Sequence, residues 1–199
     1  TVVEVATMPY DDAIEAGAFG EIRHLLHIGI GGSALGPDLL IDALGRQSER
    51  YDVAVVSNVD GAALAEAFAK FDPAYTLVAV ASKTFTTTET LLNAASALQW
   101  LEEGGVDDAL GRVIALTASP ERAMEWGVDE TRILPFNEAV GGRYSLWSSI
   151  GFPAALALGW DAFADMLEGA AEMDRHFRLA DGAENVCLLA AFVDQIYTN

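Results

Sequence analysis

The sequence contains a single cysteine and no long hydrophobic segment. Cys187 lies in the apolar run NVCLLAAFV, so a disulfide framework within the chain is excluded, and we expect a buried structural thiol in a reducing compartment. No apolar run reaches the roughly 20 residues that a membrane helix needs. A basic, then apolar, then small-residue leader is absent as well. These absences predict a soluble, cytoplasmic protein without a membrane partner.

Basic residues are also scarce. Lys and Arg together number 11 against 30 for Asp and Glu, which gives a formal charge of −19. Nucleic acids and anionic membrane surfaces are bound by basic faces, so we expect no nucleic-acid partner. Any site for an anion must therefore be built locally, from a few side chains and backbone N–H groups.

What the sequence does contain is 52% apolar residues, enough for a substantial core. Short apolar runs alternate with longer amphipathic ones, as in parallel strands joined by crossover helices. The expected strands are residues 24–30, 52–58, 76–82, 112–118 and 131–136. The first four are almost continuously apolar, so helices should cover both of their faces. The pattern predicts an α/β fold, a three-layer αβα sandwich.

Glycine, proline and capping residues mark the expected helices. Pro37 suits the first turn of a helix that ends near Gly45. A second helix should begin at Asp60 or Gly61. After residue 150 the pattern becomes helical throughout, and we expect the last two helices to lie outside the sheet repeat.

The first motif is GIGGSALG, residues 29–36, directly after the first strand. Glycines there allow a ligand to approach the backbone, and the helix that follows offers N–H groups to an anion. A tight turn without a ligand is the simpler interpretation.

A dinucleotide site is another alternative for this motif, because Gly29, Gly31 and Ala34 fit the pattern G-x-G-x-x-G/A. Such a site requires an acidic residue at the end of the second strand to bind the ribose. Ser57 and Asn58 occupy that place. The dinucleotide interpretation is therefore weak.

The second motif is VASKTFTTTET, residues 80–90, after the third strand. Five hydroxyls fall within seven residues around Lys83, at the start of a helix. Hydroxyls, N–H groups and a helix dipole together suit a phosphate. Thr86 and Glu89 have capping-box spacing, and helix capping alone is the simpler interpretation. One threonine would suffice for a cap, so the pattern favours an anion site.

The third motif is VGGRYSLWSSIG, residues 140–151. Two glycines precede Arg143 and allow its backbone an unusual approach to a neighbour. An arginine fixed there can stabilise negative charge on an oxygen, although a guanidinium cannot act as a base. The alternative is an ordinary ion pair with one of the 30 carboxylates.

The histidines do not suggest a catalytic or metal site. Alternation along the first strand places His24 and His27 on opposite faces, and His176 lies in an expected helix. None has a partner at metal-ligand spacing, so we expect no metal. The chain thus shows anion binding and charge stabilisation without a convincing proton-transfer group.

Taken together, the three motifs resemble the phosphoglucose isomerase family in order and spacing. The resemblance implies a flavodoxin-like sugar-isomerase (SIS) domain with a mainly parallel five-stranded sheet. It also implies an aldose-ketose isomerase that interconverts glucose 6-phosphate and fructose 6-phosphate in glycolysis and gluconeogenesis. The implied partners are a hexose 6-phosphate and a second subunit of a homodimer, and no metal or organic cofactor is implied.

The resemblance also implies roles for individual residues. Arg143 would stabilise the enediolate, while the other positions would bind the sugar phosphate. These binding residues are Gly32 and Ser33 in the first motif and Ser82, Lys83, Thr84, Thr86 and Thr87 in the second. Two departures from the family pattern are Ala34 and the lead into the third motif, which here reads PFNEAV before GGR, and neither touches a residue assigned a role.

The family's glutamate base, ring-opening histidine and late lysine belong to motifs that would follow Asn199. We therefore expect a fragment that is inactive by itself. The expected segments are a lead-in (1–20), the SIS domain (21–152) and a helical segment (153–199) leading to a missing second domain. A non-catalytic SIS module that senses a sugar phosphate is the alternative function.

Overall fold

A computed structural model describes residues 19–45 and 51–198. Its centre is a five-stranded sheet in which every pairing is parallel, with strand order β2-β1-β3-β4-β5. The strands are β1 (His24–Gly29), β2 (Asp52–Val56), β3 (Thr76–Ala81), β4 (Val113–Thr117) and β5 (Ile133–Pro135). All five strands predicted from the sequence are confirmed, each slightly shorter than expected.

The helices of the sheet unit follow the strands in alternation. The α-helices are α2 (Gly32–Leu44), α3 (Gly61–Lys70), α4 (Thr88–Glu103), α5 (Pro120–Trp126) and α6 (Phe152–Leu158). Short 3₁₀ helices connect them: η2 (Pro73–Tyr75), η3 (Leu110–Arg112), η4 (Glu130–Arg132), η5 (Gly142–Trp147) and η6 (Ser149–Gly151). The expected first-turn position of Pro37 is wrong, because α2 begins at Gly32 and Pro37 lies inside it.

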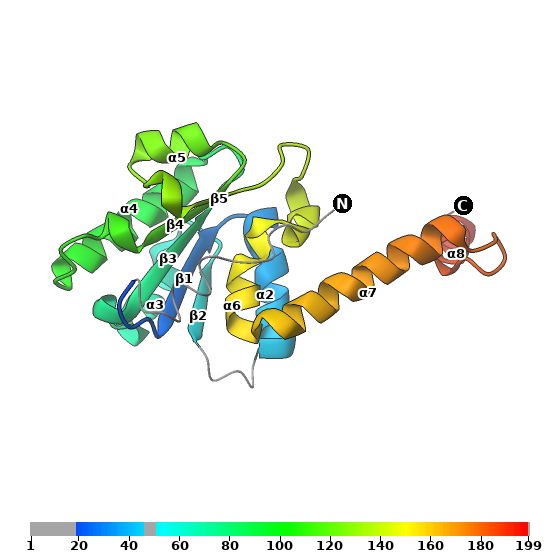
Figure 1. Cartoon of the computed structure of the whole chain (residues 1–199), viewed down its shortest axis with the longest axis horizontal. Coiled ribbons are helices and arrows are strands. Elements are labelled where there is room, and N and C mark those ends of the chain that lie inside the picture. Colours follow the sequence, from blue (N-terminus) through cyan, green and yellow to red (C-terminus); the bar gives the residue numbers. More distant parts are fainter. Residues whose placement is uncertain (1–18, 46–50, 199) are drawn as a thin grey trace. The chain divides into compact units, whose positions relative to one another are not determined.

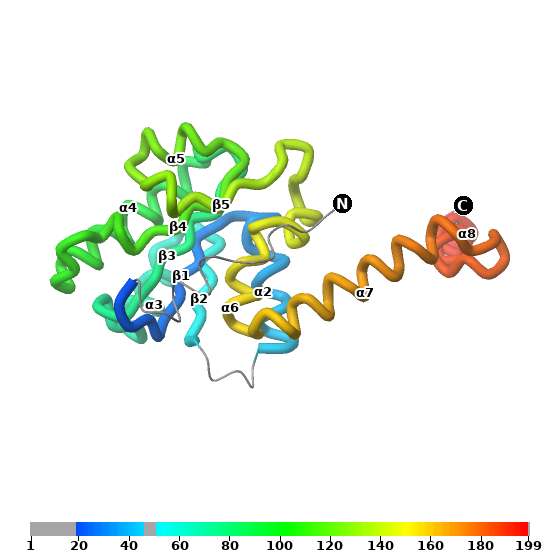
Figure 2. Tube along the Cα trace, in the orientation of Figure 1, coloured from blue at the N-terminus to red at the C-terminus, as the bar shows by residue number. Residues whose placement is uncertain are grey.

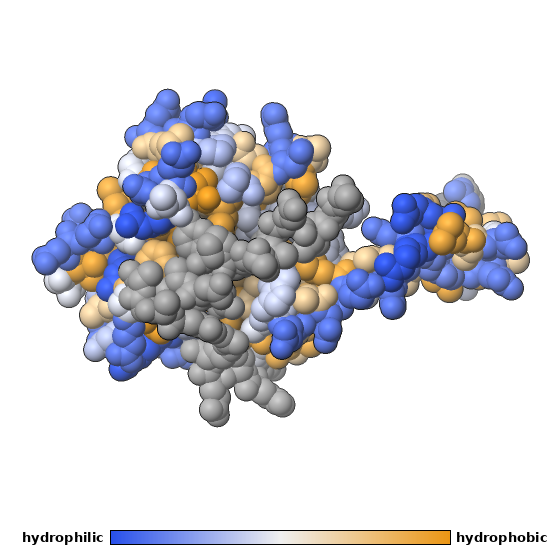
Figure 3. All heavy atoms as spheres, viewed as in Figure 1, coloured by the Kyte–Doolittle hydropathy of each residue, from blue (hydrophilic) through white to orange (hydrophobic). Residues whose placement is uncertain are grey.

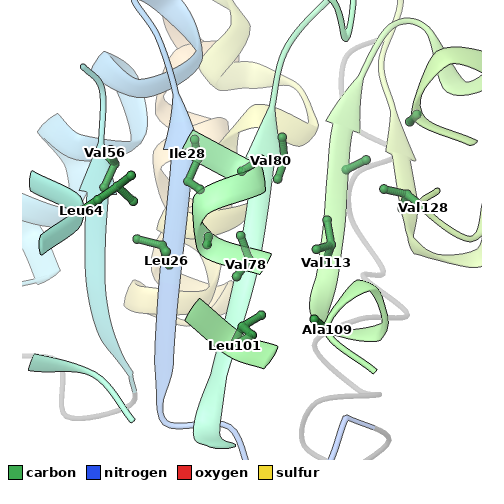
Figure 4. Close-up of a cluster of buried hydrophobic side chains, with 14 of the residues drawn as sticks. Leu26, Ile28, Val56, Leu64, Val78, Val80, Leu101, Ala109, Val113 and Val128 are labelled. Atoms are coloured by element: carbon green, nitrogen blue, oxygen red, sulfur yellow. The ribbon is translucent and has the colours of Figure 1, made fainter. Parts of the chain in front are cut away.

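One face of the sheet packs against α3, α4 and α5 (Figure 1). Alternate strand residues, including Leu26, Ile28, Val78 and Val80, point to this face and are almost fully buried (Figure 4). The helices contribute small or branched residues, such as Leu101 of α4, to the same cluster. The apolar face of each helix is therefore removed from water, which is the main favourable term for folding.

The opposite face carries α2 and α6, which complete the third layer (Figure 1). Every residue of α6 from Phe152 to Ala157 is buried. The predicted three-layer αβα sandwich is thus confirmed. The strand order is that of flavodoxin-like folds, also as predicted.

The chain divides into two compact units, Thr1–Gly159 and Trp160–Asn199. The second unit contains α7 (Trp160–Leu179) and α8 (Val186–Thr198). Hydrophobic residues are visible at its surface among hydrophilic ones (Figure 3). The prediction of a buried thiol is wrong, because Cys187 is partly exposed and lies 3.6 Å from the sulfur of Met173.

The expected lead-in, residues 1–20, lies almost wholly outside the described residues. The expected helical segment begins at residue 153, whereas α6 belongs to the same compact unit as the sheet, which ends at Gly159. Within the described ranges, no helix combines the length and the apolar content that crossing a bilayer would require.

Candidate functional site

The first two motifs meet at the carboxyl edge of the sheet. They follow β1 and β3, which are neighbours in register, with Gly29 beside Ala81. The chain turns from β1 into α2 on one face and from β3 into α4 on the other (Figure 2). In an open parallel sheet this is the topological switch point, where ligands bind. The strand order therefore places both motifs where a ligand site is expected.

The turn after β1 depends on glycine. Gly31 has φ 58°, a left-handed conformation that residues with a side chain rarely adopt. A Cβ on Gly29 would lie 2.8 Å from the carbonyl oxygen of Ser33 and 3.1 Å from the Cβ of Ala81. Glycine thus allows the first turn of α2 to lie against the end of β1. Ser33 itself is half-buried, and its N–H donates to the carbonyl of Ile30 at 3.2 Å.

The loop after β3 is anchored to the end of β4. The N–H of Ser82 donates to Leu116 O at 3.1 Å. The carbonyl of Lys83 accepts hydrogen bonds from the N–H of Ala118 at 3.0 Å and from the Thr117 hydroxyl at 3.1 Å. These bonds fix the backbone of the loop and leave the Lys83 side chain half-buried.

Hydroxyls in this loop are paired with one another. The Oγ of Ser82 lies 3.1 Å from the Oγ1 of Thr87, and the Oγ1 of Thr84 lies 2.8 Å from that of Thr86. Ser82 is buried, Thr87 is half-buried, and Thr84 and Thr86 are exposed. Each pair leaves one hydroxyl hydrogen free to turn toward an acceptor such as a phosphate oxygen.

The predicted capping box is wrong. Helix α4 begins at Thr88 with Thr87 as its N-cap, and the Thr87 side chain makes no capping hydrogen bond. Glu89 is exposed in the first turn, one position too early to pair with the cap in capping-box geometry. Helix capping therefore does not account for the threonines of this loop.

Phe85 shapes the middle of the loop. It has φ 51°, unusual for a residue with a bulky side chain, which costs of the order of 1–2 kcal/mol. The residue is only 3% exposed, and its ring packs edge-on against Trp126 at 5.9 Å between centroids. Burial of this ring holds the strained backbone and turns the neighbouring threonines outward.

The third motif touches the first through backbone atoms. A Cβ on Gly32 would overlap the carbonyl group of Gly142, so the two glycines are in direct contact. The Ser145 hydroxyl lies 3.0 Å from Gly32 O and 2.7 Å from Gly142 O, and it can donate to either. Gly142 has φ 59° and turns the chain into η5 directly before Arg143.

The third motif also meets the second. A Cβ on Gly141 would lie 3.2 Å from the Nζ of Lys83, so the ammonium group lies beside the backbone of this glycine. Because the next residue, Gly142, contacts Gly32, the three motifs converge around residues 141–142. The predicted binding residues of the first two motifs and Arg143 of the third are therefore brought to one edge of the sheet by three separate loops.

Arg143 lies within η5, and its side chain is exposed. Among the described residues it makes no ion pair or hydrogen bond, so the alternative of an ordinary ion pair finds no support there. The side chain of Lys83 is likewise unpaired within the described ranges. Lys83 lies beside the loop that carries Arg143. Two cations without a partner among the described residues can bind an anion and stabilise charge that develops on it.

Sequence reasoning missed two residues that support the site. Ser145 belongs to the third motif, but nothing in the sequence indicates that it bridges two loops. Arg122 of α5 donates to the carbonyl of Thr84 at 3.2 Å and so links the loop after β3 to α5. Such contacts span 38 and 113 residues of sequence and leave no local signal.

Of the histidines, only His27 among the described residues contacts one of the convergent loops. The ring of His24 stacks on Phe71 at 4.7 Å, while His27 faces α2 and bonds to Ser33, so the predicted separation of their faces is confirmed. Burial lowers the pKa of His27 to about 4, against the smaller opposing effect of its hydrogen bond to Ser33. His176 accepts a hydrogen bond from the N–H of Val186 at 3.0 Å. Within the described ranges no group of histidine, cysteine or acidic side chains could hold a metal ion.

Comparison with known proteins shows the family of the chain. A family model described as phosphoglucose isomerase matches residues 7–199. The chain belongs to the phosphoglucose isomerase family. Its relatives include the glucose-6-phosphate isomerase of Sphingopyxis alaskensis, 87% identical over 94% of this chain and 38% of that protein. The glucose-6-phosphate isomerase of Zymomonas mobilis is 69% identical over 94% of this chain and 37% of that protein.

The fold is also similar to that of a solved glucose-6-phosphate isomerase. The crystal structure of a glucose-6-phosphate isomerase from Chlamydia trachomatis matches with a TM-score of 0.77 and 31% identity. That match covers 92% of this chain and 36% of the other. The chain thus spans a little over a third of the length of the curated relatives it matches.

Proposed function

We propose that this chain supplies the phosphate-binding and charge-stabilising part of a glucose-6-phosphate isomerase site, with a hexose 6-phosphate as substrate. The observation that carries the proposal is the convergence of three loops at the β1/β3 switch point, with Lys83 Nζ beside Gly141. A site built in this way suits a small anionic ligand, despite the formal charge of −19.

In the proposed complex the phosphate lies in the loop after β3. Lys83 and the hydroxyls of Ser82, Thr84 and Thr87 donate to its oxygens, with Thr86 alongside. Charge-assisted hydrogen bonds of this kind are about twice as strong as neutral ones. The start of α4 adds the positive end of its dipole. Gly32 and Ser33 approach the sugar from the turn after β1.

In the proposed complex Arg143 lies at the reacting end of the substrate, near C1 and C2. Moving a proton between C1 and C2 of the sugar passes through an enediolate, in which a carbonyl oxygen becomes negatively charged. A guanidinium held near that oxygen stabilises the intermediate more than the neutral substrate, which lowers the barrier. The absence of an ion pair to a described residue leaves the Arg143 charge available for this purpose.

The groups assigned here bind and stabilise charge, and none of them cycles a proton at carbon. We therefore expect the 199-residue chain to bind fructose 6-phosphate without converting it. A coupled assay for glucose 6-phosphate tests this expectation, run beside the same chain extended to the length of its relatives. Turnover by the extended chain alone supports the proposal, whereas robust turnover by the shorter chain contradicts this division of roles.

A non-catalytic sensor of sugar phosphates is the alternative. It would use the same phosphate loop and would not need the third motif, which carries Arg143. A dinucleotide site is disfavoured further, because Asp60 serves as the N-cap of α3 and accepts from Ala62 N at 2.9 Å. Thermal-shift measurements with 6-phosphogluconate and with NAD distinguish these ligands, since a ligand bound only by the folded state raises its stability.

We further propose a homodimer and a cytoplasmic location. The dimer rests on the resemblance to the family, and the location rests on the single cysteine in a sequence without a disulfide framework. Light scattering coupled to size exclusion tests the dimer for this chain and for the extended one.

A further inference from the structure

Pro37 removes a hydrogen bond at the start of α2. In a regular helix the N–H of residue 37 would donate to the carbonyl of residue 33. Proline has no N–H, and it lies inside this helix rather than in its first turn. The carbonyl of Ser33, one of the proposed binding residues, is therefore left without its helical donor.

His27 of β1 supplies a donor at this point. Its Nε2 lies 2.7 Å from the oxygen of Ser33. Since a carbonyl oxygen can only accept, Nε2 carries the hydrogen of the neutral ring. The other ring nitrogen, Nδ1, has no hydrogen-bond partner among the described residues. The bond to Ser33 is thus the single polar contact that the structure records for this ring.

An imidazole is costly in this position. His27 is completely buried, and its neighbours in register on the adjacent strands are Val55 and Ala79. Leu25 and Leu77 on the same face are fully buried apolar residues. A buried polar atom without a partner is destabilising, so an aliphatic side chain would suit the sheet better. The destabilisation caused by the buried imidazole is explained if its hydrogen bond to Ser33 has a role in the ligand site.

We infer that His27 is a positioning residue, whose Nε2–H replaces the N–H that Pro37 lacks and so holds Ser33 and the first turn of α2 in place for the sugar phosphate. The inference rests on the proposed function, because it takes Ser33 as part of the ligand site. Gly29, at the end of β1, leaves room for the same Ser33 oxygen, since a Cβ there would lie 2.8 Å from it. The Ser33 carbonyl is held between β1 and the start of its own helix.

The first test uses two substitutions that differ in one donor. His27→Leu keeps an apolar side chain of similar bulk and removes the N–H. His27→Gln can place its amide nitrogen near the position of Nε2. We expect His27→Leu to weaken 6-phosphogluconate binding about five- to tenfold, as for one lost hydrogen bond, and His27→Gln to recover most of that loss. Equal affinity in His27→Leu and the wild type would overturn the inference.

The second test restores the bond by another route. Pro37→Ala returns an N–H to residue 37, which can donate to Ser33 O. His27→Leu should therefore weaken binding much less when it is combined with Pro37→Ala than when Pro37 is retained. If the loss is the same in both backgrounds, His27 acts through general packing and the positioning role is wrong. A merely structural contribution would not depend on which residue occupies position 37.

A third measurement needs neither ligand nor variant. The ring ¹⁵N shifts of His27 in the wild-type chain should show a protonated Nε2 and an unprotonated Nδ1 at pH 7, and the opposite tautomer would overturn the inference. If the wild-type chain binds no sugar phosphate, the proposed function fails. The hydrogen bond is then judged by amide exchange in the first turns of α2, which should be faster in His27→Leu only where Pro37 is retained.

Discussion

Lys83 and Arg143 carry positive charges without an ion pair among the described residues, in a chain with 30 acidic side chains. A surface cation in so acidic a protein readily finds a carboxylate. Here the two lie on loops that converge, one beside Gly141 and the other two residues after it. Their charges are therefore available to a ligand, and both can be tested individually.

Lys83→Met should weaken binding of 6-phosphogluconate about 10- to 100-fold, because the phosphate loses charge-assisted hydrogen bonds. Lys70→Met is the matched control. It makes the same change in net charge at the end of α3, where the Lys70 side chain is exposed and lies 3.9 Å from Asp52. Calorimetric titration should show little change for Lys70→Met. Comparable losses in both variants would indicate a general effect of charge and not a local site.

The pKa of His27 makes stability depend on pH. Burial lowers this pKa from 6.5 to about 4 in the folded chain. Between these values the unfolded chain binds a proton that the folded chain does not, so the free energy of unfolding falls as the pH drops below 6.5. The full effect is roughly 3 kcal/mol, at about 1.4 kcal/mol per pH unit.

Urea unfolding at pH 7 and pH 5 measures this dependence. The loss of stability over that interval should be about 2 kcal/mol larger for the wild type than for His27→Gln, which has no titrating group at this position. The carboxylates titrate in both proteins and cancel in the comparison. An identical pH dependence in the two proteins would show that His27 is not a buried neutral imidazole.

At the scale of elements, contact between α2 and η5 joins the first and third motifs. This contact depends on two glycines, because Gly32 lies against the carbonyl of Gly142. It also depends on the Ser145 hydroxyl, which is within hydrogen-bond distance of the carbonyl oxygens of Gly32 and Gly142. This contact places Arg143 next to the loops that follow β1 and β3. Its disruption should therefore affect the ligand site as well as stability.

Gly32→Ala should destabilise the chain by about 1–3 kcal/mol, because its Cβ overlaps the Gly142 carbonyl and η5 must shift. Gly61→Ala is the matched control at the start of α3, where a Cβ meets nothing within 4 Å. That variant should be neutral or more stable by up to about 1 kcal/mol. Denaturant midpoints compare the two, and equal effects would show that the close approach of Gly32 and Gly142 is not important.

The sequence predicts elements of this fold better than their contacts. The strands were predictable because residues such as those of β3 are buried on both faces and read as one apolar run. The start of α2 was misplaced because proline normally marks a first turn, and the compensating donor comes from another element, His27 of β1. Helix α5 was missed because seven residues give too short a periodic pattern.

The candidate site was predictable only in part, for a similar reason. Hydroxyls around Lys83 and glycines before Arg143 are local patterns that indicate anion binding. Their convergence depends on backbone contacts between Gly32 and Gly142 and on the anchoring of residues 82–83 to the end of β4. Composition and periodicity carry no information about such contacts.

At the scale of the whole molecule, the net charge of −19 opposes the binding of any anion. The repulsion is long-ranged, and salt screens it beyond about 10 Å at 0.1 M ionic strength, whereas direct contacts with Lys83 are screened much less. We therefore expect affinity for 6-phosphogluconate to rise between about 10 and 100 mM of a salt with a weakly binding anion. Calorimetry at both concentrations measures this, and a steep fall would indicate that diffuse attraction dominates.

The central claim is that the phosphate and the reacting end of one sugar phosphate bind to different loops of this chain. Calorimetric titration of the wild type and Arg143→Ala with two ligands tests it most directly. The ligands are fructose 6-phosphate and a sugar-phosphate hydroxamate whose anion imitates an enediolate. Arg143→Ala should bind fructose 6-phosphate within about threefold of the wild type and lose about 10- to 100-fold in affinity for the hydroxamate. Equal losses for both ligands, or binding of neither by the wild type, would contradict the account.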